Sequence, residues 1–530
     1  MISELFNILG EFLPKLILLI TLLTVVVLGF FKNIRNNKTI LASVSITGLA
    51  LASICFFVWI LASHEIIVLP AHEYGLFTFF YIDGNFAGGS LVLDSVSAWF
   101  SFIFCIGAIV TIFTSITCTE IKTTGLADYF SLILGAVLFA SIVAAANNII
   151  VFFLALETFS LCIYALVVAN KNSMLSAEAA MKYLLFGFLC SAIMIYGFSF
   201  LYGYSNLLTL DSTKLSESAI KFTLLSKHED IFALISVLIA VGLCFRLCVI
   251  PFHFWGPDVY QGSPAPVAWF ISTVSKACGL SALLRLYQPI FKNLLSYPQE
   301  SIPLLTLAFG SIAVISIVYS SFVALKQTDI KRLFAYASIS HAGFLLLALS
   351  FINDNSLKAA MFYLTVFVFA NLGAFWCLSK LINIAGGRCD FASWKGLGGK
   401  LPVLSALLFV FLISLAGFPP TAGFSAKFFI FQNLITEGLR ELENNAHNIN
   451  YNAAFYFTLV VTGLISCILS LFYYMKIIRI MCFEGRRETT HNSLPPASLA
   501  ITKADYAIPV VLACTIIALV GLEPLLNLLN

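Results

Sequence analysis

Apolar residues in this chain form long runs rather than the short alternations of a soluble fold. A window of about 19 residues finds fourteen stretches long enough to cross a bilayer as α-helices. They cover approximately residues 13–31, 39–62, 95–116, 126–146, 148–170, 180–203, 231–254, 265–285, 302–325, 331–352, 357–382, 402–431, 454–482 and 505–528. No linker between them is long or polar enough for a soluble domain. The pattern predicts an all-α integral membrane protein with about fourteen transmembrane helices.

Two of these stretches contain helix-breaking residues. Pro251 lies near the end of the seventh stretch, and Gly417, Pro419, Pro420 and Gly423 interrupt the twelfth. Proline removes a backbone donor and clashes with the preceding turn, so both helices should break or kink there. Unwound backbone at membrane depth is tolerated mainly beside protein or a wet cavity. We therefore expect both breaks to adjoin polar groups.

A faint internal repeat links the two breaks. Residues 179–184 (AAMKYL) open the sixth stretch, and residues 359–364 (AAMFYL) open the eleventh, at an offset of 180 residues. Arg246 falls against Lys427 at nearly the same offset. Five helices per copy is an odd number, so the second copy should be inverted in the membrane, as in transporters. The predicted organisation is an N-terminal three-helix segment (1–125), a first repeat (126–285), a second, inverted repeat (286–483) and a C-terminal helix (484–530).

Composition supports a membrane protein and excludes several other classes. The 530 residues are 60% hydrophobic and 10% charged, against about 25% charged in soluble domains. The net charge of +3 and the lack of basic runs argue against nucleic acid as a partner. The 13 cysteines are scattered through apolar runs without any C-x-x-C pair, so we interpret them as small buried hydrophobes and expect no metal or iron–sulfur site.

Lysine and arginine are distributed unequally between the two sets of loops. Loops after odd-numbered stretches hold 17 of them and loops after even-numbered stretches hold 7. The positive-inside rule then places both termini on the non-cytoplasmic side. We expect a multi-pass protein of a bacterial inner (plasma) membrane, with an organellar inner membrane as the alternative. The N-terminus has no basic n-region or small-residue cleavage site, so the first helix should be retained.

The loops account for 24 of the 29 basic residues, and besides Lys15 four remain inside the predicted helices: Lys182, Arg246, Lys276 and Lys427. One acid, Glu157, joins them in the fifth helix. Each cation at the centre of a bilayer costs about 2.5–3.5 kcal/mol even on the mildest insertion scale. Charges so costly are expected to line an ion path. A purely structural role, in which the acid only neutralises a nearby base, is the alternative.

The side chains differ in the chemistry they offer. Glu157 suits a partner for a nearby cation, and a buried lysine such as Lys276 or Lys427 can gain and lose a proton near neutral pH. Arg246 stays protonated in proteins, so it can supply only a fixed positive charge. His341, in the middle of the tenth helix between the two repeats, suits a proton relay.

Other charged residues have simpler explanations. Lys15 opens the first helix and should extend its amine to the interface. Glu178 and Lys182 are four residues apart on one helix face and should pair near the membrane edge. Residues 326–332 should form an interfacial turn that anchors two helices. His253, just after the first break, either bonds to exposed carbonyls or takes part in a relay.

Four motifs together resemble a known family. They are FRLCVIPFHFWGPDVYQGSPAPV (245–267), VSKA (274–277), LKQTDIKRLFAYASISHAGF (325–344) and LAGFPPTAGFSAKF (415–428). They resemble the antiporter-like membrane subunits of proton-pumping NADH:quinone oxidoreductase, respiratory complex I. The first motif is most similar to that of subunit N (subunit 2 in organelles). The resemblance spans roughly residues 128–483, and the motifs are long and specific.

The resemblance implies an ion-translocating subunit without a redox centre of its own, in a complex that uses NADH and quinone. It implies that Glu157 pairs with Arg246, and that Lys276 and Lys427 continue a chain of charges across the middle of the membrane. Lys182 matches a further family lysine on the sixth helix. Arg246 departs from the family pattern, which has lysine there, so a proton-storage role at the seventh helix is in doubt.

We therefore expect proton transfer coupled to quinone reduction in neighbouring subunits, with other membrane subunits, including antiporter-like ones, and the lipid bilayer as partners. A stand-alone cation/proton antiporter subunit is the first alternative, and only the PDVYQGSP stretch argues against it. A structural spacer that holds other subunits in place is the second. It predicts that neutralising Lys276 leaves ion transport unchanged.

Overall fold

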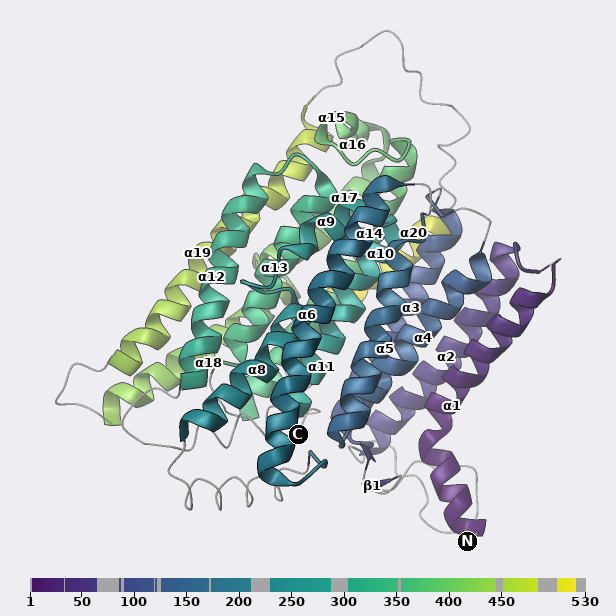
Figure 1. Cartoon of the computed structure of the whole chain (residues 1–530). Helices are drawn as coiled ribbons and strands as arrows, with labels where there is room; N and C mark the ends of the chain where they lie inside the picture. Colours follow the sequence, from purple (N-terminus) through teal and green to yellow (C-terminus); the bar gives the residue numbers. More distant parts are fainter. Residues whose placement is uncertain are drawn as a thin grey trace.

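The computed structural model describes residues 2–520, except residues 33, 64–84, 87–89, 119, 122–124, 171–172, 211–228, 287–303, 351–353, 445–450 and 485–502. The chain folds as a bundle of long helices that run up and down alternately (Figure 1). A two-stranded hairpin, β1 (Asn85–Phe86) with β2 (Leu91–Val92), lies at the end of the bundle where α1 begins.

The helices correspond to the predicted stretches. In order they are α1 (Ile2–Phe30), α2 (Lys38–Ser63), α3 (Ser95–Thr117), α4 (Leu126–Ala145), α5 (Ile149–Val167), α6 (Met174–Ser205), α8 (Glu229–Leu247), α9 (Trp255–Gly262), α10 (Ala265–Phe270), the π-helix η3 (Ile271–Ser275), α11 (Lys276–Leu286), α12 (Leu304–Lys326), α13 (Ile330–Ala348), α14 (Asp354–Ile384), α15 (Phe391–Trp394), α16 (Leu397–Lys400), α17 (Pro402–Ala416), α18 (Ala422–Asn444), α19 (Tyr451–Cys482) and α20 (Lys503–Val520). The α10, η3 and α11 segments follow one another without a gap and form the eighth predicted span. The end of the fourteenth span, residues 521–528, lies outside the described residues.

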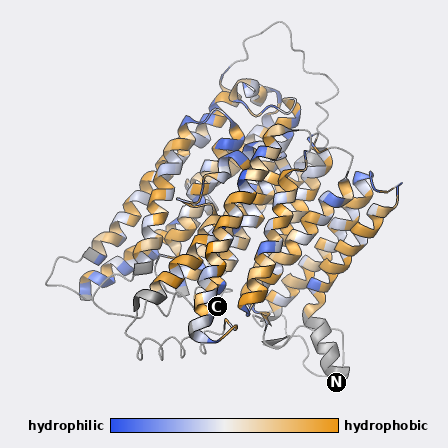
Figure 2. Ribbon diagram, viewed as in Figure 1, coloured by the Kyte–Doolittle hydropathy of each residue, from blue (hydrophilic) through white to orange (hydrophobic). Residues whose placement is uncertain are grey.

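Length and hydropathy alone identify fewer spans than the predicted fourteen. Within the described residues, ten helices are long and apolar enough to cross a membrane, or up to eleven if the bent segment 391–416 is one span. The seventh and fourteenth predicted spans contain shorter apolar helices, Ala233–Leu247 and Tyr506–Leu519. Apolar residues cover the sides of the bundle (Figure 2), as expected for a surface that faces lipid or other membrane subunits.

Both predicted breaks are present and are built alike. The first helix of each pair, α8 or α17, ends four residues before Pro251 or Pro420. The next residue, Cys248 or Gly417, has a positive φ of 59° or 81°. This left-handed conformation ends a helix and is natural for glycine but unusual for cysteine. The chain then resumes as α9 or α18.

A repeat is visible in which helices pack together. In the first repeat α4 contacts α5, and α6 contacts both α8 and α9. In the second repeat α12 contacts α13, and α14 contacts both α17 and α18.

The predicted match of Arg246 with Lys427 does not hold when each residue is placed relative to the break in its helix. Arg246 lies five residues before Pro251, whereas Lys427 lies seven residues after Pro420. The residue seven positions after Pro251 is Asp258.

The turn between α12 and α13 anchors several helices, as predicted. Asp329 caps α13 through the backbone N–H of Arg332. The Lys331 amine lies 3.2 Å from Oε1 of Glu120 and donates to the carbonyl of Ser263. Glu120 also accepts from the N–H of Ala265, at the start of α10, at 2.7 Å. This contact ties the loop after α3 to the start of α10 and to α13.

Candidate functional site

The first element of the site is a buried ion pair. Nη2 of Arg246, in the last turn of α8, lies 2.8 Å from Oε1 of Glu157 on α5. The hydroxyl of Ser191 on α6 donates to the same oxygen at 2.6 Å. Arg246 is 2% exposed, whereas the Glu157 side chain is 18% exposed, so the acid lies nearer the outer surface of the bundle. The predicted pairing is confirmed.

Polar atoms around this pair have unused hydrogen-bonding capacity. Among the described residues, Nη1 of Arg246 and the hydroxyl of Tyr164 are buried without a hydrogen-bond partner. Such groups are the usual sites of buried water. Arg246 also packs closely on α11, since a Cβ added at Gly279 would lie 3.3 Å from the Cβ of Arg246. The close approach brings the ion pair to the helix that carries Lys276.

Lys276 begins α11 directly after the π-helix η3, and a π turn inside a helix often marks a functional position. Its amine donates a hydrogen bond to the backbone carbonyl of Ser338 on α13. The side chain is 3% exposed. Within the described residues no carboxylate forms a salt bridge with it. Lys276 is therefore a buried amine held by a carbonyl rather than by an acid.

A cluster of hydroxyl and amide groups surrounds this contact. The Tyr260 hydroxyl lies 2.9 Å from the hydroxyl of Ser338, and the hydroxyl of Ser272 lies 3.5 Å from it. Asn371 on α14 donates to Ser272 at 2.5 Å. The cluster joins α9 and η3 of the first repeat to α13 and α14 of the second. Lys276 therefore lies at the junction of the repeats.

His341 follows Ser338 by three residues on α13 and is buried. Nδ1 lies 2.7 Å from the hydroxyl of Tyr363 on α14, and Nε2 lies 3.1 Å from that of Tyr474 on α19. The ring centre of Phe367 is 4.8 Å from that of His341 and 6.0 Å from the amine of Lys276. Both imidazole nitrogens are thus in hydrogen bonds, as a proton relay requires.

Lys427 lies in the second break. Its amine donates to the carbonyls of Leu415 (3.2 Å) and Ala416 (2.8 Å), which the end of α17 leaves without helical partners. A Cβ on Gly417 would lie 2.8 Å from Cδ of Lys427, so glycine leaves room for the lysine stem as well as for the positive φ. The break therefore supplies the acceptors for this buried cation.

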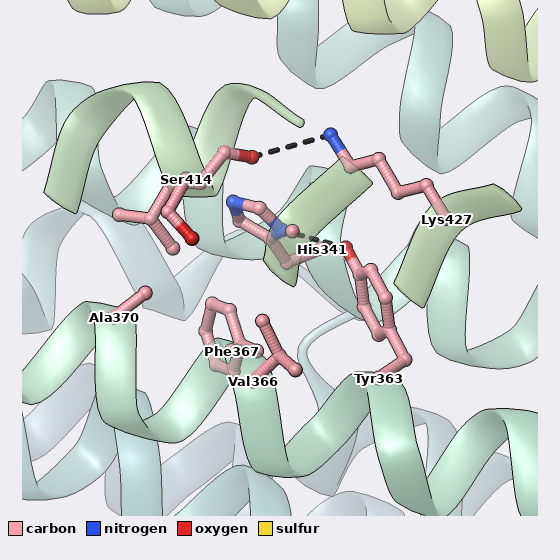
Figure 3. A pocket seen from close by; sticks show the side chains of 9 residues that line it. His341, Tyr363, Val366, Phe367, Ala370, Ser414 and Lys427 are labelled. Carbon is pink, nitrogen blue, oxygen red and sulfur yellow. Dashed lines mark hydrogen bonds between the residues drawn. The ribbon is translucent and has the colours of Figure 1, made fainter. Parts of the chain in front are cut away.

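Lys427 and His341 face the same small cavity (Figure 3). Its lining includes Tyr363, Phe367 and Ser414, and the Ser414 hydroxyl is buried without a hydrogen-bond partner among the described residues. The cavity volume of about 10 Å³ is at the lower limit for one water molecule. Lys427 and His341 are thus separated by a space that a water molecule could bridge.

Lys182 lies apart from the other charged and titratable residues of the site. These form a row that consists of Glu157, Arg246, Lys276, His341 and Lys427. The Lys182 amine contacts Glu178 and Asp258, each at 2.7 Å, and its side chain is 40% exposed. It precedes Ser191, which holds Glu157, by nine residues of α6, or about 13 Å at 1.5 Å per residue. The predicted pair with Glu178 is confirmed. The structure assigns Lys182 to a network at the end of the bundle, together with Arg332, which lies 2.8 Å from Asp258.

Two other expectations can be compared with the structure. Lys15 does not extend to the interface: it is 5% exposed, so that prediction was wrong. His253 packs on the rings of Phe254 and Tyr319, and its Nδ1 has no hydrogen-bond partner among the described residues. Within the described part of the chain, no hydrogen bond or ion pair joins His253 to Glu157, Arg246, Lys276, His341 or Lys427.

Sequence reasoning missed the neutral members of the site. None of them carries a charge that stands out in an apolar run; they are Ser191, Tyr260, Ser272, Ser338, Tyr363, Phe367, Asn371 and Tyr474. One signal was available: Tyr363 lies within the AAMFYL half of the internal repeat. The remaining contacts depend on which helices pack together, which the repeat alone does not determine.

The site combines one ion pair with three buried titratable side chains. Glu157 and Arg246 form one charged pair, and Lys276, His341 and Lys427 follow as buried titratable groups linked by carbonyls, hydroxyls and a small cavity. Groups of this kind can bind and pass on protons. Within the described residues, no group of three or more metal-ligating side chains is present.

Comparison with known proteins agrees with this chemistry. Residues 146–441 match the family model described as NADH:quinone oxidoreductase/Mrp antiporter, transmembrane. The chain is 32% identical to NADH-quinone oxidoreductase subunit N 2 of Chloroherpeton thalassium, over 88% of this chain and 84% of the relative.

Two solved structures share the fold. One is a chain of respiratory complex I from Thermus thermophilus, with a TM-score of 0.70 and 28% identity over 97% of this chain and 98% of that one. The other is a chain of the Mrp complex from Dietzia sp. DQ12-45-1b, with a TM-score of 0.77 but 18% identity over 98% and 96%. The second likeness shows the fold alone, and the sequence identity separates the two. The chain belongs to the family of antiporter-like membrane subunits of NADH:quinone oxidoreductase, and within it to subunit N.

Proposed function

We propose that this chain translocates protons along the row Glu157, Arg246, Lys276, His341 and Lys427, driven by quinone reduction in neighbouring subunits of the complex. The observation that carries the proposal is the hydrogen bond from Lys276 to α13, one turn before His341. It connects α11, on which Arg246 packs, with α13, whose His341 lines one cavity together with Lys427. A buried row with these contacts has no evident role in packing.

The proposed mechanism begins with a change in the Glu157–Arg246 ion pair. Arg246 keeps its charge, so only a movement of Glu157 relative to Arg246 changes the field at Lys276. When the pair separates, the uncompensated guanidinium disfavours a proton on Lys276, and the proton passes by way of His341 toward Lys427. When the pair closes again, Lys276 can take up another proton.

The energy scale of this step is suitable. Moving one charge against 100 mV requires about 2.3 kcal/mol. Removing one partner of a buried ion pair costs about 3–5 kcal/mol, because it leaves a charge without compensation. Partial opening of a pair such as Glu157–Arg246, driven by the neighbouring subunits, would therefore store free energy on the scale needed to move one proton.

The partial exposure of Glu157 indicates where a partner subunit could bind. Glu157 is partly exposed on α5, between outward-facing apolar residues such as Leu154 and Leu161. A neighbouring antiporter-like membrane subunit seated there could act on Glu157 directly. We assign the chain to a bacterial inner membrane, with its termini on the non-cytoplasmic side. We propose that it binds no cofactor, while NADH and quinone are used elsewhere in the complex.

The alternative is a stand-alone cation/proton antiporter subunit, which the shared fold with the Mrp chain favours. Purification of the native assembly separates the two proposals. We expect quinone reductase activity to co-purify with this chain, and proton uptake into vesicles to depend on added electron donor and quinone. Cation/proton exchange without quinone reductase activity would support the antiporter instead.

A further inference from the structure

A second buried ion pair lies outside the row. It joins Glu120, in the loop after α3, to Lys331, in the first turn of α13. The Lys331 amine lies 3.2 Å from one carboxylate oxygen of Glu120 and 3.4 Å from the other. The side chain of Lys331 is 6% exposed and that of Glu120 is 19% exposed. A charge-assisted contact of this kind is stronger than a neutral hydrogen bond, so the pair holds the loop on α13.

Each partner also holds the backbone at the start of α10. Oε2 of Glu120 accepts from the N–H of Ala265 at 2.7 Å, and the Lys331 amine donates to the carbonyl of Ser263 at 3.1 Å. Pro264, which lies between these two residues, has no N–H to donate. The first N–H groups of a helix have no partner within the helix, so the carboxylate supplies the acceptor for Ala265. The pair therefore binds the chain on both sides of the proline.

The end of α13 that carries Lys331 is itself fixed. The Asp329 carboxylate accepts from the N–H of Arg332 at 3.0 Å and caps the helix. The N–H of Ile330 donates to the carbonyl of Cys389, in the segment before α15, at 2.9 Å. Lys331 thus joins the start of α10 to a helix end that has its own anchors.

The two helices that begin at this ion pair meet again at Lys276. The span Ala265–Leu286 runs without a gap through η3, and Lys276 lies eleven residues after Ala265, or about 16 Å along the helix. Ser338 lies seven residues after Lys331, or about 10 Å along α13. Side chains of a helix point back toward its N-terminus, so the Lys276 side chain covers part of that difference and its amine reaches the carbonyl of Ser338. A shift of the start of α10 along α13 would therefore move this amine away from its acceptor.

We propose that Glu120 and Lys331 are positioning residues for Lys276. By fixing the start of α10 against α13, they keep the Lys276 amine at the carbonyl of Ser338. They do not exchange the transferred proton themselves. The inference rests on the proposed function, because it treats Lys276 as a proton carrier whose position matters, and it adds how that position is set from the end of the bundle.

Glu120→Ala tests the proposal, because it removes the acceptor for Ala265 and the partner of Lys331 together. In vesicles that contain the whole complex, we expect the number of protons moved per quinone reduced to fall by about fivefold, as for the loss of one hydrogen bond. In a structure of the variant complex determined by electron cryomicroscopy, we expect the Lys276 amine to lie beyond hydrogen-bonding distance of the carbonyl of Ser338.

Glu120→Gln is the rescue variant. The oxygen of Glu120 that accepts from Ala265 also accepts from Lys331, and an amide oxygen can accept two hydrogen bonds without a charge. We therefore expect Glu120→Gln to retain the contact between Lys276 and Ser338 and most of the proton ratio.

Glu484→Ala is the matched control. The Glu484 carboxylate lies 3.0 Å from the amine of Lys395, so this variant also removes an ion pair at the ends of helices, but one formed by α15 and the residues after α19. We expect it to leave the proton ratio unchanged. Should Glu120→Ala fail to assemble, Glu120→Asp takes its place, because a side chain one methylene shorter cannot hold Ala265 and Lys331 at their present positions. We expect the same changes in Glu120→Asp, at a smaller size.

A lower ratio together with a broken contact between Lys276 and Ser338 in Glu120→Ala, both restored in Glu120→Gln, supports the inference. An unchanged ratio in the assembled Glu120→Ala complex overturns it. A lower ratio with that contact intact, an equal loss in Glu120→Gln, or an equal loss in Glu484→Ala also overturns it. If Lys276→Met lowers the ratio while Glu120→Ala does not, the inference fails and the proposed function stands. If Lys276→Met leaves the ratio unchanged, the proposed function fails, whereas the structure of the Glu120→Ala complex still shows whether Glu120 positions Lys276.

Discussion

Lys276 donates a hydrogen bond to the carbonyl of Ser338, one turn of α13 before His341. A single helix of the second repeat therefore carries both the acceptor for the lysine of the first repeat and the next titratable side chain. Any movement of α13 relative to α11 would change both contacts together.

For proton pumping, a positive charge at position 246 should matter more than whether arginine or lysine carries it. We expect Arg246→Lys to retain proton pumping, because a lysine can still pair with Glu157. Arg246→Ala should lose pumping and leave a buried carboxylate without compensation, at a cost of about 3–5 kcal/mol in stability. Proton uptake by vesicles that contain the assembled complex measures the effect. Equal pumping in the alanine variant would remove Arg246 from the mechanism.

The hydroxyl of Tyr363, which forms a hydrogen bond with Nδ1 of His341, should affect the rate of proton transfer. Tyr363→Phe removes one hydrogen bond worth about 1 kcal/mol, so pumping should slow by about fivefold. Tyr129→Phe is a matched control, since Tyr129 is also buried and its hydroxyl lies 2.8 Å from that of Ser115, away from the row. Transfer rates that fall equally in both variants would indicate a general packing effect.

The second break should not tolerate a side chain at Gly423. A Cβ there would overlap the carbonyl oxygen of Ser414, so α17 and α18 would have to move apart. We expect Gly423→Ala to destabilise the subunit by about 1–3 kcal/mol. Gly203→Ala on α6 is the control, since nothing lies within 4 Å of its added Cβ and alanine favours a helix. Thermal unfolding in detergent compares the two, and equal melting temperatures would contradict the prediction.

The network around Asp258 should weaken in acid. Burial alone would raise the pKa of Asp258, but Lys182 and Arg332 outweigh it and hold that pKa below its ordinary value. Its contribution to stability is then fully present above pH of about 4 and is lost as the pH falls through the lowered folded-state pKa. Asp258→Asn should cost about 1 kcal/mol at pH 7. Unfolding curves of both proteins should converge below pH 4, and a constant difference would exclude this role.

Much of the fold could be predicted because lipid imposes simple rules. The helical stretches followed from apolar runs, and both breaks followed from Pro251 and Pro420. Comparing residue offsets was less reliable: Arg246 and Lys427 are 181 residues apart, but they lie on opposite sides of their breaks. Counted from Pro251 and Pro420, the residue in the same position as Lys427 is Asp258.

The charged members of the site were predictable for the same reason, since ionisable groups are costly in lipid. Position along a span was a poor guide to burial, however. Lys15 lies near the end of its span, where a lysine usually reaches water, but its face of α1 is covered by other helices. Hydrogen-bond partners such as Ser338 and Tyr474 come from helices far apart in sequence. The pattern of apolar and polar residues in the sequence does not predict those hydrogen bonds between helices.

The most direct test is the ratio of protons moved to quinone reduced in vesicles containing the whole complex with Lys276→Met. Lys326→Met, at an exposed lysine at the end of α12, is the control. We expect the ratio to fall by about tenfold or more in Lys276→Met, because the buried amine that takes up the proton is gone. We expect an unchanged ratio in Lys326→Met. An unchanged ratio in the fully assembled Lys276→Met complex would contradict proton transfer through Lys276.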